Sequence, residues 1–82
     1  MKIPHELQEE FRSEAALIAR LQETDRLFRE LASGYDEVNR QIYRIESEDE
    51  PTTDEVLEDL KKQRLKLKDE IREMLARVER RM

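Results

Sequence analysis

The sequence contains no cysteine and no tryptophan, and among its 82 residues it has one glycine and two prolines. The absence of cysteine excludes disulfide scaffolds, thiolate metal sites and cysteine nucleophiles. The low content of glycine and proline excludes collagen-like and low-complexity chains. No apolar run approaches the roughly 20 residues that a membrane-spanning helix needs. We therefore expect a charge-rich helical protein that does not enter a membrane.

Charged residues make up 45% of the chain, and their order says more than the net charge of −5. Residues 46–59 carry eight acidic side chains and no basic one, whereas residues 60–82 carry nine basic and four acidic side chains. Opposite charges on antiparallel helices can pair, and acidic residues near the start of a helix interact favourably with its dipole. The negative net charge gives no indication of non-specific binding to nucleic acid. The N-terminal stretch MKIPHELQEEF lacks the apolar core of a signal peptide, so a cytoplasmic protein is expected.

A series of positions in the first half of the chain is spaced alternately four and three residues apart. All but Thr24 are apolar: Leu17, Leu21, Thr24, Phe28, Leu31, Tyr35, Val38, Ile42 and Ile45. A 3.5-residue repeat held over four heptads keeps one side of a helix against a partner helix, as in a coiled coil. Period-two alternation and Asn-Gly or Asp-Gly turns are absent, so strands are not expected.

A second series with the same spacing follows, interrupted by one charged residue: Leu57, Leu60, Arg64, Leu67, Ile71, Met74 and Val78. Pro51 separates the two series, and proline ends a helix because it lacks an N–H and clashes with the preceding turn. Thr52 with Glu55 three residues later is typical of a capping box at the start of a new helix. So short a connection makes the two helices antiparallel neighbours.

These patterns predict an all-α fold, an antiparallel two-helix coiled-coil hairpin that assembles into a helical bundle. One domain would cover residues 1–82, with a helix over 5–47, a turn over 48–52 and a helix over 53–81. The apolar series keeps its phase through Gly34, so we expect a continuous helix there that the Ser-Gly pair can bend, with a separate third helix as the alternative. The apolar members of the two series form the predicted hairpin interface: Leu17, Leu21, Phe28, Leu31, Tyr35, Val38, Ile42, Ile45, Leu57, Leu60, Leu67, Ile71, Met74 and Val78.

The charged position of the second series has two interpretations. If the turn centres near residues 49 and 50, Tyr35 lies opposite Arg64. Either the guanidinium stacks on the aromatic ring in a cation–π contact worth about 0.5–1 kcal/mol, or the side chain extends outward into solvent.

The first predicted helix is longer than the second, so residues 5–17 would extend about 20 Å beyond the hairpin at about 1.5 Å per residue. A lone two-helix hairpin would also be marginally stable, because burial and ordering entropy nearly cancel at this size. We therefore expect self-association or docking onto a larger partner. Apolar residues without a partner helix would form that partner interface: Leu7, Phe11, Ile18 and Leu27.

No residue pattern indicates catalysis, since a glycine-rich phosphate loop, a Ser/His/Asp set and an H-E-x-x-H motif are all missing. His5 and Glu9 have the i,i+4 spacing of two metal ligands, but a third ligand is lacking. The acidic residues between 46 and 54 lack the ordered loop and central glycine of a calcium site. We expect a non-enzyme with no catalytic residue, cofactor, metal or small-molecule substrate.

The basic run KKQRLKLK, residues 61–68, has two interpretations, a binding site for an acidic ligand or a solvated helix face. Its lysines and Arg72 could contact phosphates or an acidic protein. Asp69 and Glu70 lie close by and supply charge pairs along the helix, and no aromatic residues alternate with the basic ones for base stacking. A solvated helix face is therefore the simpler interpretation of this run.

Two stretches resemble the YdcH-like proteins: LIARLQETDRLFRELASGYDEVNRQIYRIE, residues 17–46, and LKKQRLKLKDEI, residues 60–71. The second stretch is the more specific, since any coiled coil shares the heptads of the first. The resemblance extends over roughly residues 14–80. It implies a helical hairpin in a bacterial cytoplasmic protein and brings no activity, because the YdcH-like proteins belong to a domain family of unknown function.

The leading hypothesis is a non-catalytic coiled-coil module for protein–protein interaction. It would self-associate as a homo-oligomer or serve as a small accessory subunit of a larger bacterial assembly. The alternative is a small protein that binds nucleic acid or the ribosome through its basic second helix. The first hypothesis predicts that the partner is a protein, and it predicts no nucleic acid or membrane as partner.

Overall fold

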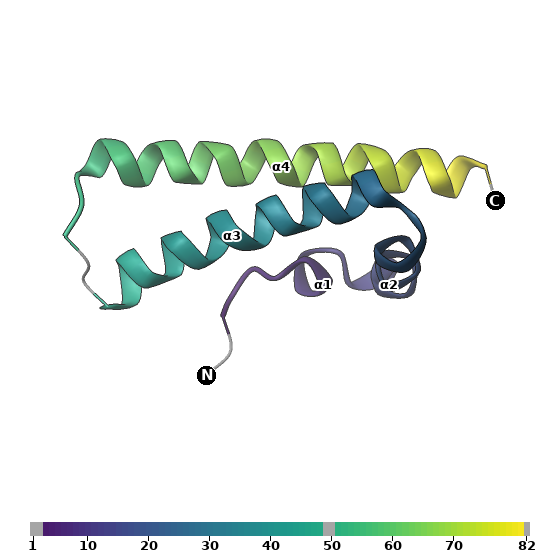
Figure 1. Cartoon of the computed structure of the whole chain (residues 1–82), viewed down its shortest axis with the longest axis horizontal. Helices are drawn as coiled ribbons and strands as arrows, with labels where there is room; N and C mark the ends of the chain where they lie inside the picture. Colours follow the sequence, from purple (N-terminus) through teal and green to yellow (C-terminus); the bar gives the residue numbers. More distant parts are fainter. Residues whose placement is uncertain (1–2, 49–50, 82) are drawn as a thin grey trace.

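The structure is a computed structural model that describes residues 3–48 and 51–81. Its elements are the short helix α1 (Leu7–Glu10), the 3₁₀ helix η1 (Arg12–Glu14), α2 (Ala15–Thr24), α3 (Arg26–Glu48) and α4 (Asp54–Arg80) (Figure 1). The described residues are 87% helical and include no strand. The predicted all-α class is confirmed.

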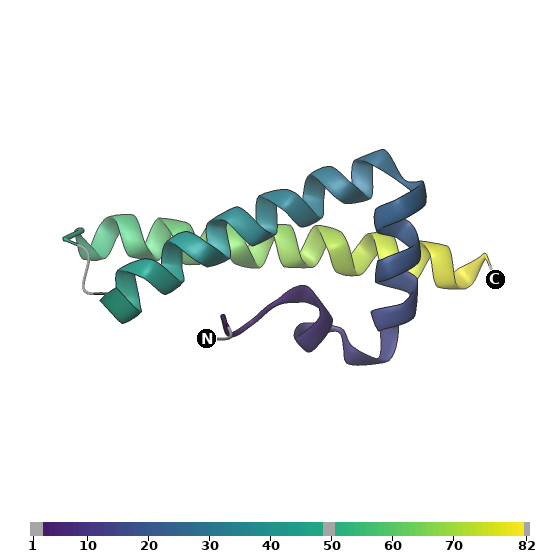
Figure 2. The same ribbon diagram turned by 60° about the horizontal axis from the view of Figure 1, so that its bottom comes forward.

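The two long helices, α3 and α4, lie side by side and run in opposite directions (Figures 1 and 2). The predicted antiparallel hairpin is therefore confirmed. Helix α4 begins and ends one residue inside its predicted range. Residues 49 and 50 of the predicted turn lie outside the described residues.

The start of α4 differs by one residue from the predicted capping box. Thr53, not Thr52, is the N-cap, and its hydroxyl oxygen accepts a hydrogen bond from the backbone N–H of Val56 at 3.1 Å. Asp54 and Glu55 occupy the first turn, where negative charge interacts favourably with the helix dipole.

The predicted continuous helix over residues 5–47 is wrong, because the chain leaves helical geometry twice. Phe11 separates α1 from η1 with φ −127° and ψ 60°. Asp25 separates α2 from α3 in an extended conformation, with φ −126° and ψ 113°. Its Oδ1 accepts a hydrogen bond from the backbone N–H of Phe28 at 3.0 Å, so Asp25 caps the new helix as aspartate commonly does.

The break at Asp25 changes the direction of the chain, and α2 runs across the hairpin instead of along it (Figure 2). Residues 5–17 therefore fold back over the hairpin and do not extend beyond it. Helix α3 in turn passes through Gly34 without interruption. A Cβ atom at Gly34 would meet the Leu67 side chain at 3.7 Å, an ordinary van der Waals distance.

The apolar core combines the hairpin with the elements that precede it. Its buried members come from α1, α2, α3 and α4 and from Phe11 between α1 and η1: Leu7, Phe11, Ile18, Leu21, Phe28, Ala32, Tyr35, Ile71 and Leu75. The apolar stripe of α3 is too wide for α4 alone to cover. The chain covers the remainder with its own N-terminal residues.

The predicted hairpin interface is buried to different degrees. Its buried members are Leu21, Phe28, Tyr35, Val38, Ile42 and Ile71. Its half-buried members are Leu17, Leu31, Ile45, Leu57, Leu60, Leu67, Met74 and Val78. The sequence patterns missed Leu75, which is buried four residues after Ile71; counting i,i+4 neighbours as well as the strict series would have found it.

Candidate interaction surface

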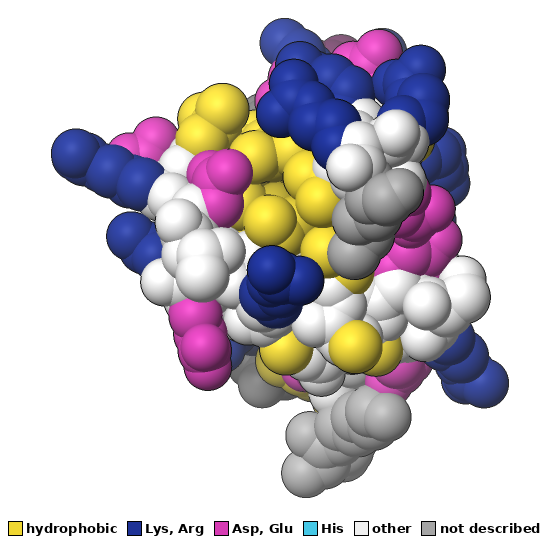
Figure 3. Space-filling view, turned by 90° about the vertical axis from the view of Figure 1, so that its right-hand side faces the viewer, with side chains coloured by type: hydrophobic (Ala, Val, Ile, Leu, Met, Phe, Trp, Pro, Cys, Tyr) yellow, Lys and Arg dark blue, Asp and Glu magenta, His cyan; other side chains and the backbone are white. Residues whose placement is uncertain are grey.

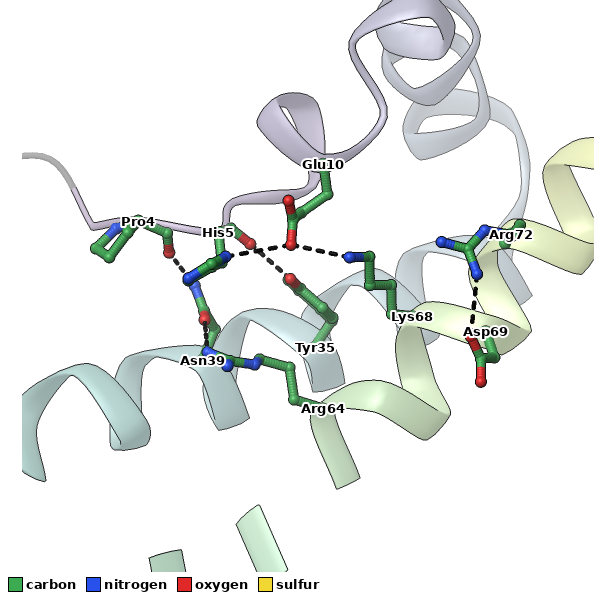
Figure 4. A network of polar contacts seen from close by, with 9 residues as sticks. All are labelled: Pro4, His5, Glu10, Tyr35, Asn39, Arg64, Lys68, Asp69 and Arg72. Atoms are coloured by element: carbon green, nitrogen blue, oxygen red, sulfur yellow. Dashed lines mark hydrogen bonds and ion pairs between the residues drawn. The ribbon is translucent and has the colours of Figure 1, made fainter. Parts of the chain in front are cut away.

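Residues 3–14, called here the N-terminal segment, are held on the hairpin by polar contacts (Figure 4). The Tyr35 hydroxyl of α3 donates a hydrogen bond to the backbone carbonyl of His5 at 2.5 Å. One turn further along α3, Asn39 Nδ2 donates to the backbone carbonyl of Pro4 at 2.9 Å. Both side chains are buried, with exposed fractions of 0% for Tyr35 and 2% for Asn39.

Helix α4 completes this network from the other side. Arg64 Nη1 donates to Asn39 Oδ1 at 2.9 Å, so the buried amide is satisfied at both ends. Lys68 Nζ lies 3.0 Å from Glu10 Oε1, and His5 Nδ1 lies 3.2 Å from the same oxygen. The N-terminal segment is thus attached to both helices of the hairpin.

The contact of Arg64 with Asn39 resolves the two interpretations of that arginine. The guanidinium is held by this hydrogen bond, so it neither stacks on the Tyr35 ring nor extends free into solvent. A cation–π contact does join the hairpin to the N-terminal segment, but through other residues. The guanidinium carbon of Arg72 lies 5.6 Å from the centre of the Phe11 ring.

The network shifts two pKa values. The hydrogen bond from Lys68 lowers the pKa of Glu10 below its ordinary value of 4.5, and the contact with His5 acts in the same direction against the effect of burial. The attachment through Glu10 is therefore fully present at neutral pH and is lost as the pH falls through this lowered value. Burial raises the pKa of Tyr35 to about 12, with the negative charge of Glu10 as a smaller cause.

Three of the four residues predicted to face a partner are buried within the chain itself. Leu7, Phe11 and Ile18 belong to the core, so the prediction is wrong for them: the N-terminal elements fold back and use these side chains intramolecularly. Leu27, the fourth, is 58% exposed.

Leu27 lies in an apolar hollow where the start of α3 meets the last turns of α4. The hollow is lined by Asp25, Leu27, Met74, Arg77, Val78 and Arg81. A second hollow at the same end lies between η1, α2 and α4, and is lined by Ser13, Glu14, Ala16, Leu17, Arg20 and Glu79. Figure 3 shows hydrophobic side chains gathered there, with both basic and acidic side chains around them. The residues of the two hollows are called the end surface.

The sequence offered two metal-like patterns, and neither forms a described cluster. His5 contacts Glu10, the residue after its predicted companion Glu9. Among residues 3–48 and 51–81, no group of three His, Cys, Asp or Glu side chains is placed to hold a metal ion. Asp49 and Glu50 of the acidic stretch lie outside the described residues.

The basic run of α4 makes several contacts within the chain. Lys61 pairs with Glu46 of α3 at 3.2 Å, Lys68 with Glu10, and Arg64 with Asn39. No sequence signal indicated the role of Asn39, because its partner on the N-terminal segment is a backbone carbonyl.

Of the helices in the described part of the chain, none combines the length and apolar character needed to cross a bilayer.

Comparison with known proteins identifies a family. The profile of a family described as "Protein of unknown function (DUF465)" matches residues 28–75, a stretch that begins in α3 and ends in α4. The N-terminal segment and α2 lie outside it. No curated protein and no solved structure matches the chain. Since the matched stretch covers more than half of its residues, the chain belongs to this family of unknown function, which includes the YdcH-like proteins.

Proposed function

We propose that the chain is a non-catalytic module for protein–protein interaction, a small accessory subunit in the bacterial cytoplasm that contacts another protein through its end surface. The observation that carries the proposal is the exposure of Leu27 beside the half-buried Met74 and Val78. These side chains form a continuous apolar hollow with an arginine border. Removing such a surface from water is the usual driving force of association.

The polar network supports an interaction module over an enzyme. Its two shifted groups, Glu10 and Tyr35, form hydrogen bonds that attach the N-terminal segment. Their pKa shifts follow from that attachment and from burial. Both groups are thus accounted for by a structural role.

The contacts of α4 support a protein partner over a nucleic acid. Lys61 and Lys68 are paired with carboxylates of the same chain, and Arg64 with an amide. Cations engaged in this way are less available to displace the counterions of phosphates, which is the main source of affinity for nucleic acid.

The proposal is tested by Leu27→Gln, which replaces the apolar side chain by a polar one of similar size. Tagged full-length chains are used to capture partners from the native host, and captured proteins are identified by mass spectrometry. We expect Leu27→Gln to bind the captured protein about 5- to 30-fold more weakly than the wild type and to retain correspondingly less of it, because about 1–2 kcal/mol of apolar contact is removed.

Val56→Gln is the matched control. Val56 is also exposed, at 47%, but it lies at the opposite end of α4. Its substitution is expected to leave capture unchanged. Equal capture by all three chains would show that the end surface is not the interface, and an RNA retained by the chain at low salt would favour the nucleic-acid alternative.

A further inference from the structure

The outward face of α4 carries charges in four blocks of alternating sign. In chain order these are acidic Glu55, Glu58 and Asp59, basic Lys62 and Lys66, acidic Asp69 and Glu73, and basic Arg77 and Arg80. Successive members are spaced three or four residues apart or lie one helical step beside one another, so they share one side of the helix. All of them are exposed, and α1, α2 and α3 lie on the other side of α4 (Figure 1). We call this face the α4 stripe.

Pairing within the chain does not account for this order. Within α4, an ion pair joins Arg72 to Asp69 at 3.2 Å. Lys62, Lys66 and Glu73 form no ion pair with another described residue. Each block also places like charges three or four residues apart, as Lys62 with Lys66 and Asp69 with Glu73. Such pairs destabilise an isolated helix by a few tenths of a kcal/mol, and opposite charges at the block borders only offset that cost.

The order is self-complementary when two α4 helices run antiparallel. With a two-fold axis between residues 67 and 68, Lys66 of one chain lies opposite Asp69 of the other, and Lys62 lies opposite Glu73. Outside this centre, Glu58 lies opposite Arg77 and Glu55 opposite Arg80. A parallel arrangement would place each block against its own sign. Because charge pairing between helices sets partner and orientation, the stripe fits one geometry.

The centre of the stripe also contains an exposed apolar residue. Leu65 is 59% exposed and lies in a shallow hollow with a charged lining of Lys62, Lys66, Asp69, Glu70, Arg72 and Glu73. In the antiparallel arrangement the two copies of Leu65 lie on opposite sides of the axis, a few residues apart. Each contacts the aliphatic stems of the partner's charged side chains, which supplies an apolar contact at the middle of the interface.

We propose that the α4 stripe is a docking surface for a second copy of this chain, bound antiparallel about a two-fold axis and held mainly by charge. A two-fold interface uses the same patch on both copies, which this stripe provides. The inference deepens the proposed function by naming one partner and rests on it in treating the chain as an interaction module. The stripe shares Arg77 with the end surface, but its central residues and Leu27 belong to one surface each.

The test uses full-length chains in sedimentation velocity, over a micromolar concentration series at low ionic strength. The acidic variant carries Lys62→Glu and Lys66→Glu; the basic variant carries Asp69→Lys and Glu73→Lys. The wild type is expected to dimerise, and each variant alone to dissociate at least about tenfold more readily, because like charges then face each other. An equimolar mixture of the two variants is expected to dimerise again, since acidic positions of one meet basic positions of the other throughout the centre.

A chain with all four exchanges is the control for net charge. It keeps the wild-type charge and is expected to dimerise with itself. All four positions are exposed, so circular dichroism should show unchanged helicity. Monomeric wild type at low salt, unaffected dimers of the single-sign variants, or a mixture that stays monomeric would each overturn the inference.

Leu27→Gln separates this inference from the proposed function. It is expected to dimerise like the wild type while losing capture of the other protein. Dimers lost with Leu27→Gln would overturn the inference and assign self-association to the end surface.

Discussion

Tyr35 links three parts of the molecule at the scale of a single residue. Its ring lies in the core, its hydroxyl holds the N-terminal segment through the carbonyl of His5, and it belongs to the heptad series of α3. The heptad spacing predicted its burial correctly. The hydrogen bond could not be predicted, because the acceptor is a main-chain atom 30 residues away in a segment that was expected to extend from the hairpin.

The raised pKa of Tyr35 predicts a loss of stability at alkaline pH. The unfolded chain loses the phenol proton near pH 10, whereas the folded chain keeps it to about 12. The free energy of unfolding should therefore fall as the pH rises from about 10 to 12. Tyr35→Phe should lower stability by about 1 kcal/mol at pH 7, since it removes a hydrogen bond, and should make the alkaline loss smaller. Urea unfolding of the wild type and of Tyr35→Phe, followed by circular dichroism at pH 7 and across the rise from about 10 to 12, measures these free energies.

Tyr43→Phe is the control for that experiment, because Tyr43 is the other tyrosine of the chain. An alkaline loss that is equal in the two variants would contradict the assignment to Tyr35.

At the scale of elements, local signals decided which boundaries could be predicted. Helix α4 was placed to within one residue because Pro51 and the threonine before an acidic first turn mark a helix start strongly. The break at Asp25 was missed because the heptad series keeps its phase from Leu21 to Phe28 across it. Thr24 and Asp25 form an N-cap signal by residue type, and the unbroken apolar spacing concealed it.

The cap at Asp25 gives a prediction on the stability of α3. Asp25→Ala removes the acceptor of the Phe28 N–H and should lower the free energy of unfolding by about 1 kcal/mol. Asp25→Asn keeps a side-chain oxygen at the same place and should lose much less. Thermal or urea unfolding of both variants checks the difference. Equal losses would indicate that charge, and not capping, is what Asp25 contributes.

At the scale of the whole molecule, the chain buries with its own residues the apolar side chains that the sequence patterns assigned to a partner protein. Spacing identified Leu7, Phe11 and Ile18 as apolar residues that need cover. Spacing alone does not distinguish cover by the same chain from cover by another, because the hydrophobic effect is non-directional. The deciding features were two short interruptions, at Phe11 and Asp25, that turn the N-terminal elements back over the hairpin.

Phe11→Ala tests whether the N-terminal segment can detach from the hairpin while the hairpin stays folded. Truncating a buried phenylalanine typically costs about 3–5 kcal/mol, but a docked segment can detach at a lower cost than global unfolding. Hydrogen exchange should therefore show lost protection in residues 5–14 and a smaller change at the centre of α3 and α4. Leu27→Ala, at an exposed position, should change neither. Uniform loss of protection along the chain would show that segment and hairpin unfold as one unit.

The anchorage of the N-terminal segment has an evolutionary consequence. Asn39 and Tyr35 bind the main-chain oxygens of Pro4 and His5, and every amino acid possesses such an oxygen. His5 adopts a φ of 65°, which asparagine and glycine tolerate as well. The residues at these two acceptor positions can therefore be substituted while both hydrogen bonds are kept. Relatives that keep this fold-back are better recognised by the pair of donors, one turn apart on α3, than by any motif in the residues those donors hold.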